Sequence, residues 1–196
     1  KQTSIMNENL KRQLGDWWPV LKPIFNSQKF MALREALKQE YSSGHVYPSA
    51  DNVFRAFELT QFHNLKVVIL GQDPYHNGIA TGLAFATNNG RMSRSLRNIL
   101  KELHDSYGCD VPADFDTSLE HWAKEGVLLI NTSLTVREKQ PNSHKKLWDG
   151  FTEQVIKLII ANHKNIVFVG WGKDAANLLS NCYVKHKEPI MSLFPE

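Results

Sequence analysis

Cysteine is scarce in this sequence: Cys109 and Cys182 are the only two among 196 residues. They form no CxxC pair, and two cysteines cannot build the disulfide framework that stabilises small secreted domains. No apolar run approaches the roughly 18 residues that a membrane-spanning helix needs, and the first ten residues contain no apolar core of a secretory signal. We therefore expect an intracellular protein, cytoplasmic or nuclear depending on its source, with no membrane contact.

The sequence also lacks several motifs of enzymes and metal sites. It contains no HExxH, no EF-hand loop, no GxxxxGK[ST] and no GxSxG, so zinc protease, calcium sensor, P-loop and α/β-hydrolase interpretations have no support. Residues 170–173 are too short a segment to form a phosphate-binding loop. We expect no metal site, because four histidines outside the clusters discussed below lack the spacing of metal ligands. These histidines are His63, His104, His121 and His163.

The charge balance is nearly even. Lysine and arginine number 23 against 20 aspartates and glutamates, a net charge of +3, which permits a polyanionic partner without requiring one. Each of three basic clusters is either a contact surface for a polyanion or an ordinary solvated face. The clusters are Arg91, Arg94, Arg97 and Lys101; His144, Lys145 and Lys146; and Lys185, His186 and Lys187.

Apolar periodicity predicts an α/β fold. Short apolar runs are typical of strands buried on both faces, as in a parallel sheet. They occupy residues 67–70, 127–130, 166–169 and 190–193. Helical spacing of apolar residues is present at residues 30–37, 96–103 and 155–162. Ser42 to Gly44 ends the first of these helices, and Ser93 and Ser95 are candidate caps of the second. We expect one domain with a central, mostly parallel sheet flanked by helices.

Polar residues follow the predicted strands. In open α/β sheets, ligands bind at the carboxyl ends of the strands. The predicted strands deliver residues 71–73, 131–133, 170–172 and 194–195 to that edge. An acid, Asp73, and an amide, Asn131, are therefore expected to converge on one ligand. The alternatives are that Asp73, which precedes a proline, only starts a turn and that Asn131 is a loop amide bonded to backbone.

The segment Gly71-Gln72-Asp73-Pro74-Tyr75-His76 is identical to the signature of the family 1 uracil-DNA glycosylases. Further segments resemble that family in the same order, and the likeness covers nearly the whole chain from about Trp17. We therefore expect residues 1–196 to form a single uracil-DNA glycosylase-like domain in which residues 1–16 are an N-terminal extension. The further segments are residues 46–48, 53–57, 82–85, 128–131, 134–137 and 142–145.

The resemblance implies a base-flipping enzyme that excises uracil from DNA without a metal or organic cofactor. It implies that Phe85 stacks on the flipped uracil and that Asn131 bonds the Watson–Crick edge. The segment at Gln72 supplies backbone contacts to the base. Tyr75 lies against C5 and excludes the methyl group of thymine by steric contact. Without the motif, an ordinary core aromatic would be the interpretation for Phe85.

The resemblance also implies the catalytic residues. The carboxylate of Asp73 stabilises the cation-like sugar and positions the attacking water, with His76 near that water.

For DNA contacts, the resemblance points to Ser95, Ser143 and His144. Arg91 and Arg94 lie where the family has a proline-rich loop, and phosphate neutralisation by these arginines predicts strong salt dependence.

Two departures from the family bear on the rate. The family places a His-Pro-Ser motif and then a leucine loop after its last core strand, whereas residues 194–196 here are Phe-Pro-Glu. Phenylalanine donates no hydrogen bond to uracil, so we expect a loss of rate on the order of 10²–10³-fold. The loop after His76 is also one residue shorter than is usual in the family, which alters the geometry around Asp73.

Three functions of different classes remain. The first is a DNA repair glycosylase that hydrolyses the N-glycosidic bond of uracil in DNA at a reduced rate. The second is a weak or inactive reader of uracil in DNA, or a partner-binding module, on the same fold; an unrelated small-ligand protein is a third alternative. The expected partners are uracil-containing DNA, single or double stranded, and a protein inhibitor or replication partner. We expect a monomer.

Overall fold

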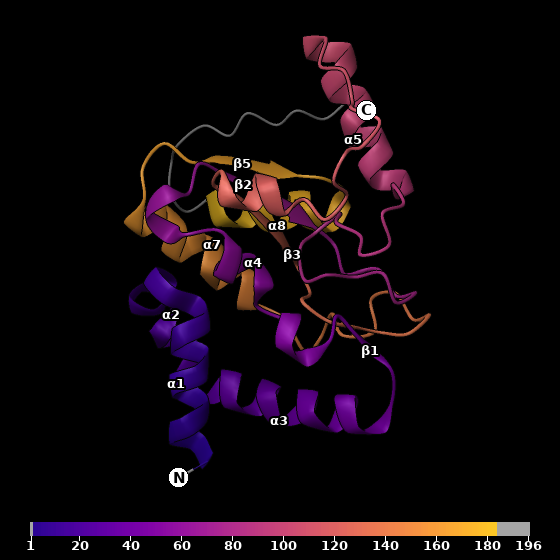
Figure 1. The fold of residues 1–196 in the computed structure, drawn as a ribbon. Coiled ribbons are helices and arrows are strands. Elements are labelled where there is room, and N and C mark those ends of the chain that lie inside the picture. The colour runs from indigo at the N-terminus through magenta and orange to yellow at the C-terminus, as the bar shows by residue number, and fades with distance from the viewer. Residues whose placement is uncertain (1, 184–196) are drawn as a thin grey trace.

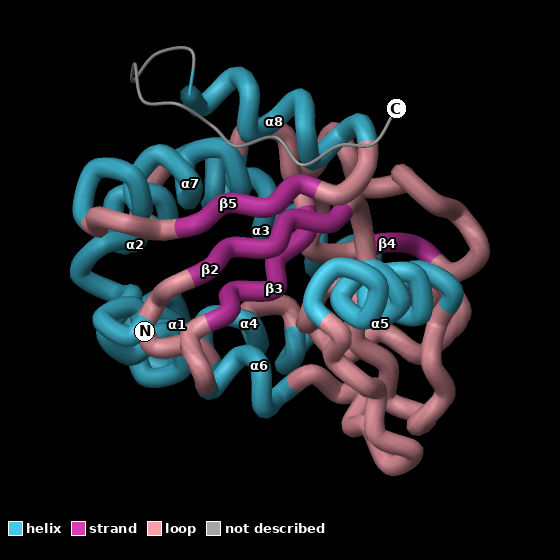
Figure 2. Tube along the Cα trace, turned by 90° about the horizontal axis from the view of Figure 1, so that it is seen from above, coloured by secondary structure: helices cyan, strands magenta, loops and turns pink. Residues whose placement is uncertain are grey.

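A parallel sheet of three strands lies at the centre of the computed structural model, which describes residues 2–183 (Figures 1 and 2). The strands are β2 (Val67–Gly71), β3 (Val127–Asn131) and β5 (Val167–Gly170), in the order β3-β2-β5. The middle strand is buried, with Val68 and Leu70 at 0% exposure, because helices cover both faces of the sheet. Three of the predicted strands are confirmed, and the fourth, residues 190–193, lies outside the described residues.

Helices surround this sheet. Those of the described part of the chain are α1 (Gln2–Leu14), α2 (Trp18–Phe25), α3 (Gln28–Ser43), α4 (Arg55–Leu59), α5 (Arg94–Tyr107), α6 (Glu120–Lys124), α7 (Phe151–Asn162) and α8 (Lys173–Tyr183). Helix α8 contacts β5 and β2, α4 and α6 contact β3, and α7 packs between α2 and α8. Figure 2 shows α5 beyond the carboxyl ends of the strands. The predicted α/β class is confirmed.

Helix ends follow the predicted caps. The Ser93 hydroxyl accepts a hydrogen bond from the Leu96 amide at 3.1 Å and so begins α5. Ser95 instead lies in the first turn of that helix and is exposed. Helix α3 ends at Gly44, as predicted. The cap at Ser93 matters for the site because it fixes where the amino end of α5 lies.

An aromatic cluster joins α2, α3 and α7. The ring of Phe25 lies 4.6 Å from that of Phe30 and 6.0 Å from that of Phe151, edge to face in both cases. Phe54 packs on the same rings. Such pairs contribute about 0.5–1.5 kcal/mol each beyond the area they bury. The cluster therefore holds α3 firmly against the rest of the fold.

A small antiparallel pair was not predicted. Strand β1 (Val46–Tyr47) pairs with β4 (Val136–Arg137), with Val46 opposite Arg137. Two-residue strands have no measurable alternation, so the sequence gives no signal for them. The pair ties the segment after α3 to the segment after β3.

The amino-terminal helix packs on the fold. Helix α1 contacts α4, and Leu14 at its end is buried. The assignment of residues 1–16 to an N-terminal extension of a single domain stays a prediction. Among the described residues, no helix combines the length and the apolar character that crossing a membrane requires.

Candidate active site

A pocket of about 330 Å³ opens at the carboxyl ends of β2 and β3, which is within the range of small-ligand pockets, about 300–1,000 Å³. It brings together the residues predicted to bind and cleave the nucleotide, so the expected convergence of an acid and an amide is observed. Ser95 reaches it from α5, and Pro141 and Trp171 complete it. The lining residues are Gln72, Asp73, Pro74, Tyr75, His76, Ala80, Leu83, Phe85, Ser95, Asn131, Pro141 and Trp171.

Gly71 allows two of these side chains to lie close to the strand end. It pairs with Asn131 in the parallel ladder. A Cβ at position 71 would lie 2.4 Å from Asn131 Oδ1 and 3.2 Å from the Phe85 ring. Any side chain at Gly71 would therefore displace the amide, the ring or both.

Phe85 is held in a strained conformation. Its φ is 67°, in the left-handed region, which costs a non-glycine residue about 1–3 kcal/mol and persists only where surrounding contacts impose it. The neighbouring Ala84 amide donates to Leu129 O at 3.1 Å. The ring meets Trp171 edge to face, with centroids 5.4 Å apart. These contacts fix the ring at the pocket.

Trp171 was not among the predicted site residues. Its amide donates to Leu70 O at 3.2 Å, directly after β5. Its position as the first residue beyond a buried strand is the signal that could have identified it.

Asp73 is bonded to a distant part of the chain. Its Oδ2 accepts a hydrogen bond from the Asn142 amide at 2.7 Å, and its Oδ1 lies 3.4 Å from Gln72 Nε2. Gln72 Nε2 also donates to Asn142 Oδ1 at 2.9 Å. A carboxylate that only started a turn would bond amides next to it in sequence, whereas this one is oriented by a residue 69 positions later. Asn142 was missed as a site residue.

His76 presents a free nitrogen near the pocket. Its Nδ1 is buried and has no hydrogen-bond partner among the described residues. Its carbonyl accepts a hydrogen bond from the Lys139 amide at 2.9 Å. The backbone of His76 is thus fixed, while its buried Nδ1 has no partner within the described part of the chain.

The orientation of Tyr75 is set by α5. Its hydroxyl donates to Ser93 Oγ at 2.5 Å, the same oxygen that caps the helix. The phenol is half-buried and lines the pocket. Because its hydroxyl is engaged, the ring faces the pocket as a wall.

The predicted DNA-contact residues lie in two places. Arg91, Arg94 and Ser95 are exposed at the beginning of α5. Ser143 Oγ accepts from the Arg137 amide at 2.8 Å. The imidazole of His144 has no exposed surface (0%), so in this structure it is a buried polar group. His144 therefore offers no surface to DNA in this structure.

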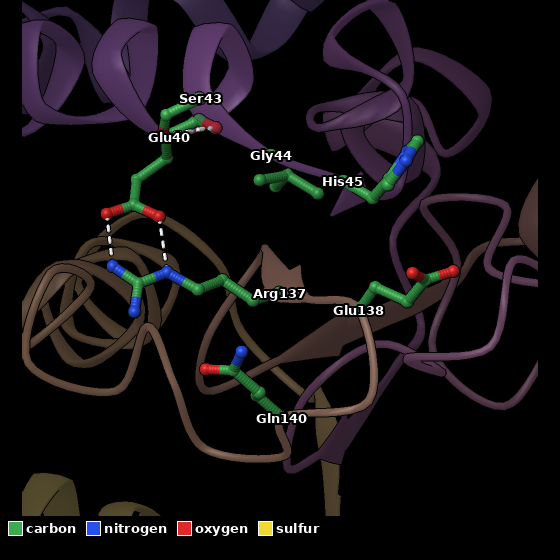
Figure 3. A pocket seen from close by; sticks show the side chains of 8 residues that line it. Glu40, Ser43, Gly44, His45, Arg137, Glu138 and Gln140 are labelled. Carbon is green, nitrogen blue, oxygen red and sulfur yellow. Dashed lines mark hydrogen bonds and ion pairs between the residues drawn. The ribbon is translucent and has the colours of Figure 1, made fainter.

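His144 belongs to a buried polar chain. Its Nδ1 lies 2.7 Å from Thr135 Oγ1, and its Nε2 lies 3.1 Å from Glu40 Oε2. Glu40 also accepts two hydrogen bonds from the Arg137 guanidinium beside a hollow of about 310 Å³ (Figure 3). The bonds from Arg137 lower the pKa of Glu40 to about 2, although burial opposes them. Burial lowers the pKa of His144, so the imidazole is neutral at neutral pH.

Comparison with known proteins places the chain in a family. A family model described as "Uracil DNA glycosylase superfamily" matches residues 57–194. The curated relative named uracil-DNA glycosylase from Bacillus velezensis is 48% identical over 170 residues, which cover 85% of this chain and 74% of the relative. One from Bacillus cereus is 47% identical over 164 residues, which cover 82% and 72%. The chain belongs to the uracil-DNA glycosylase superfamily.

Solved structures agree with this assignment. Mimivirus uracil-DNA glycosylase superposes with a TM-score of 0.78 at 26% identity, and the match covers 85% of this chain and 63% of that one. The chain therefore spans less than two thirds of the mimivirus protein. A mimivirus UNG variant solved in complex with UGI matches with a TM-score of 0.77. The wild-type UNG of Nitratifractor salsuginis, with a TM-score of 0.63 at 24% identity, shares the fold. The predicted family is confirmed.

The glycosylase pocket contains no cluster of metal ligands. Within residues 2–183, no group of three His, Cys, Asp or Glu side chains is arranged to hold a metal ion.

The first prediction concerns Gly71. In Gly71→Ala, the new Cβ would meet Asn131 Oδ1, so Asn131 must move. We expect a loss of roughly 1–3 kcal/mol in the free energy of unfolding, as for overpacked sites. Denaturant unfolding measures the loss, and a crystal structure of the variant would reveal the displaced amide. Gly44→Ala is the control, because Gly44 has an extended backbone and open space around its Cα; we expect it to change stability by less than about 0.5 kcal/mol. Equal losses in the two variants would contradict the prediction.

The second prediction concerns the stability of the fold at low pH. The pKa of Glu40 is about 2 in the folded protein against 4.5 for the free side chain, so the unfolded chain binds the proton more tightly. The stabilisation of the fold by the ionised Glu40 carboxylate is therefore complete above about pH 4.5 and is lost as the pH falls towards about 2.

Urea unfolding tests this prediction. At neutral pH, the free energy of unfolding of the wild type should exceed that of Glu40→Gln by roughly 1.5–3 kcal/mol, which is the contribution of hydrogen bonds to a charged group. The difference should shrink between about pH 5 and about pH 3. A difference that stays constant over this range would show that the Glu40 charge does not stabilise the fold.

Proposed function

We propose that this chain hydrolyses the bond between uracil and deoxyribose in DNA, as a base-excision repair glycosylase. One observation carries the proposal: Asp73, Phe85 and Asn131 line one pocket in a chain 48% identical to a protein named uracil-DNA glycosylase. The acid, the aromatic ring and the amide are the groups that cleavage, stacking and base recognition require.

Base recognition follows from the floor of the pocket. A nucleotide must leave the duplex to enter, at a cost of roughly a few kcal/mol. Stacking on the Phe85 ring and two hydrogen bonds to the Asn131 amide offset that cost, since an amide both donates and accepts. Gly71 keeps these two groups close together, so a single pyrimidine meets both.

Tyr75 provides the selectivity against thymine. Thymine differs from uracil by the methyl group at C5, and a rigid wall there excludes it. The hydrogen bond from the Tyr75 hydroxyl to Ser93 prevents the ring from rotating away. The wall is therefore as rigid as the amino end of α5.

Asp73 and His76 carry the cleavage step. As the bond between C1′ and N1 breaks, the sugar becomes cation-like and the base leaves with the electron pair. The Asp73 carboxylate stabilises the cation and orients a water, whose oxygen bonds to C1′ while its proton is released. The Asn142 amide keeps one carboxylate oxygen in place, and Asp73 and His76 both line the pocket.

DNA is held at the rim. Ser95 lines the pocket from the first turn of α5, where backbone amides and the helix dipole favour a phosphate. Arg91 and Arg94 neutralise neighbouring phosphates. Ser143 lies on the other side of Asp73, within the segment that bonds it, whereas the imidazole of His144 is buried and does not reach the DNA.

Partners and rate remain proposals. UGI, which binds a mimivirus UNG variant, represents the class of protein inhibitor that this pocket mouth would bind. A replication partner and a monomeric state also remain predictions. Phe194, which motivates the expected reduction in rate, lies outside the described residues.

The third prediction tests the enzyme. Wild-type protein in excess over an oligonucleotide with a single uracil should leave an alkali-labile abasic site. Asp73→Asn keeps the shape of the side chain but loses its charge, so the single-turnover rate should fall at least about a hundredfold. Alkaline strand scission measures both rates. Tight uracil-dependent binding without scission by wild type, even at high protein excess, would establish a reader instead.

The fourth prediction tests the basic rim. Each phosphate contact contributes about 0.9 to the slope of log affinity against log salt for duplex DNA, or about 0.7 for single strands. Arg91→Ala/Arg94→Ala should therefore reduce the slope by roughly 1.4–1.8 in fluorescence anisotropy titrations. Lys66→Ala/Lys164→Ala removes the same charge before β2 and β5, at the opposite edge of the sheet, and should leave the slope unchanged. Equal slopes for all three proteins would exclude a phosphate role for Arg91 and Arg94.

A further inference from the structure

The loop 137–144 bonds both proposed catalytic residues. The Lys139 amide donates to the carbonyl of His76 at 2.9 Å, and the Asn142 amide donates to Asp73 Oδ2 at 2.7 Å. Both bonds come from backbone amides, so the path of the loop determines where His76 and Asp73 lie. A shift of the loop moves them even if every side chain in the pocket is unchanged.

That path is one the loop would not favour by itself. Lys139 and Asn142 have φ values of 57° and 62°. Asparagine tolerates this left-handed conformation, whereas lysine adopts it only when its surroundings impose it. Ser143 Oγ closes the loop locally by accepting from the Arg137 amide. Contacts from outside the loop must supply the remaining constraint.

Glu40, in the last turn of α3, makes such contacts with both ends of the loop. Arg137 at one end donates to both carboxylate oxygens from Nε and Nη2 (Figure 3). His144 at the other end places Nε2 3.1 Å from Glu40 Oε2. One carboxylate thus joins two residues that are seven positions apart in the chain.

The partners of Glu40 are themselves fixed. His144 Nδ1 lies 2.7 Å from Thr135 Oγ1, which accepts from Trp148 Nε1 at the same distance. Arg137 belongs to β4, paired with β1. Helix α3 is held by the aromatic cluster around Phe25. The constraint therefore runs from a rigid helix to the loop and then to Asp73.

We propose that Glu40 is a positioning residue of the glycosylase: by binding Arg137 and His144, it sets the loop whose amides orient His76 and Asp73. Glu40 does not line the pocket and touches neither substrate nor water in the reaction. His144, at 0% exposure, contributes through this network rather than by direct contact with DNA. The inference rests on the proposed role of Asp73.

The experiment compares Glu40→Ala with wild type. The single-turnover rate of uracil excision should fall about tenfold to a hundredfold, the effect of misplacing reacting groups by about 1 Å. The Kd for uracil-containing DNA should change by less than about twofold, because Phe85, Asn131 and the basic rim are untouched. Amide exchange measured by NMR should become at least about tenfold faster at Lys139 and Asn142.

The control is Glu35→Ala. Glu35 lies on the same helix, is exposed and pairs only with Lys38 among the contacts described for it, so rate and exchange should match wild type. If Glu40→Ala does not fold, Glu40→Gln takes its place, since Gln has the same size and keeps one acceptor oxygen. Measurements are made well below the unfolding temperature, so that lost stability alone does not lower the rate.

The outcomes separate the two proposals. A rate within about twofold of wild type, or a slower rate with Lys139 and Asn142 still protected, overturns the positioning role. Wild-type activity in Asp73→Asn would instead overturn the proposed role of Asp73, whatever the Glu40 variants do. Loss of rate together with loss of protection at both amides, with Kd preserved, supports the inference.

Discussion

The parallel pairing of β2 with β3 places Gly71 opposite Asn131 at the edge of the sheet, and the pocket depends on this register. Shifting one strand by a single residue would reverse the face of every side chain on it and remove Asn131 from the pocket. The missing side chain at Gly71 then lets the Phe85 ring approach the same point. A buried ladder that is apolar up to Asn131 thus fixes the positions of the polar groups at and beyond its end.

Three of the five non-glycine residues that have positive φ in the described part of the chain lie around this edge. Phe85, Lys139 and Asn142 all have positive φ, and each lies in the pocket or bonds a residue that does. Departures from local preference are expected where function requires a geometry that propensity alone would not give. The polar chain from Trp148 to the partly buried Glu40 is a second departure, since burying polar side chains such as His144 is costly unless each polar atom is bonded. Here each has a partner, so the network adds rigidity without unpaired charge.

The sequence predicted those parts that rest on local pattern. The apolar runs at β2, β3 and β5, the cap at Ser93 and the end of α3 at Gly44 all follow from burial and backbone preference. The convergence of Asp73 and Asn131 follows from the topology of parallel sheets. The amide of Asn142 and the carboxylate of Glu40 could not be predicted this way. Their roles depend on contacts between residues far apart in sequence, and no periodicity records such contacts.

The arrangement around Asp73 also distinguishes an enzyme from a reader of uracil. A reader needs the Phe85 ring and the Asn131 amide, because stacking and edge hydrogen bonds are sufficient for affinity. It gains nothing from a carboxylate held against the sugar, whose negative charge repels the flanking phosphates. In this protein, the Asn142 amide bonds that carboxylate, and the partly exposed ion pair between Glu40 on α3 and Arg137 on β4 joins the helix to the same loop. The free energy spent on holding it has a purpose only if a positive charge develops beside it, as it does when a glycosidic bond breaks.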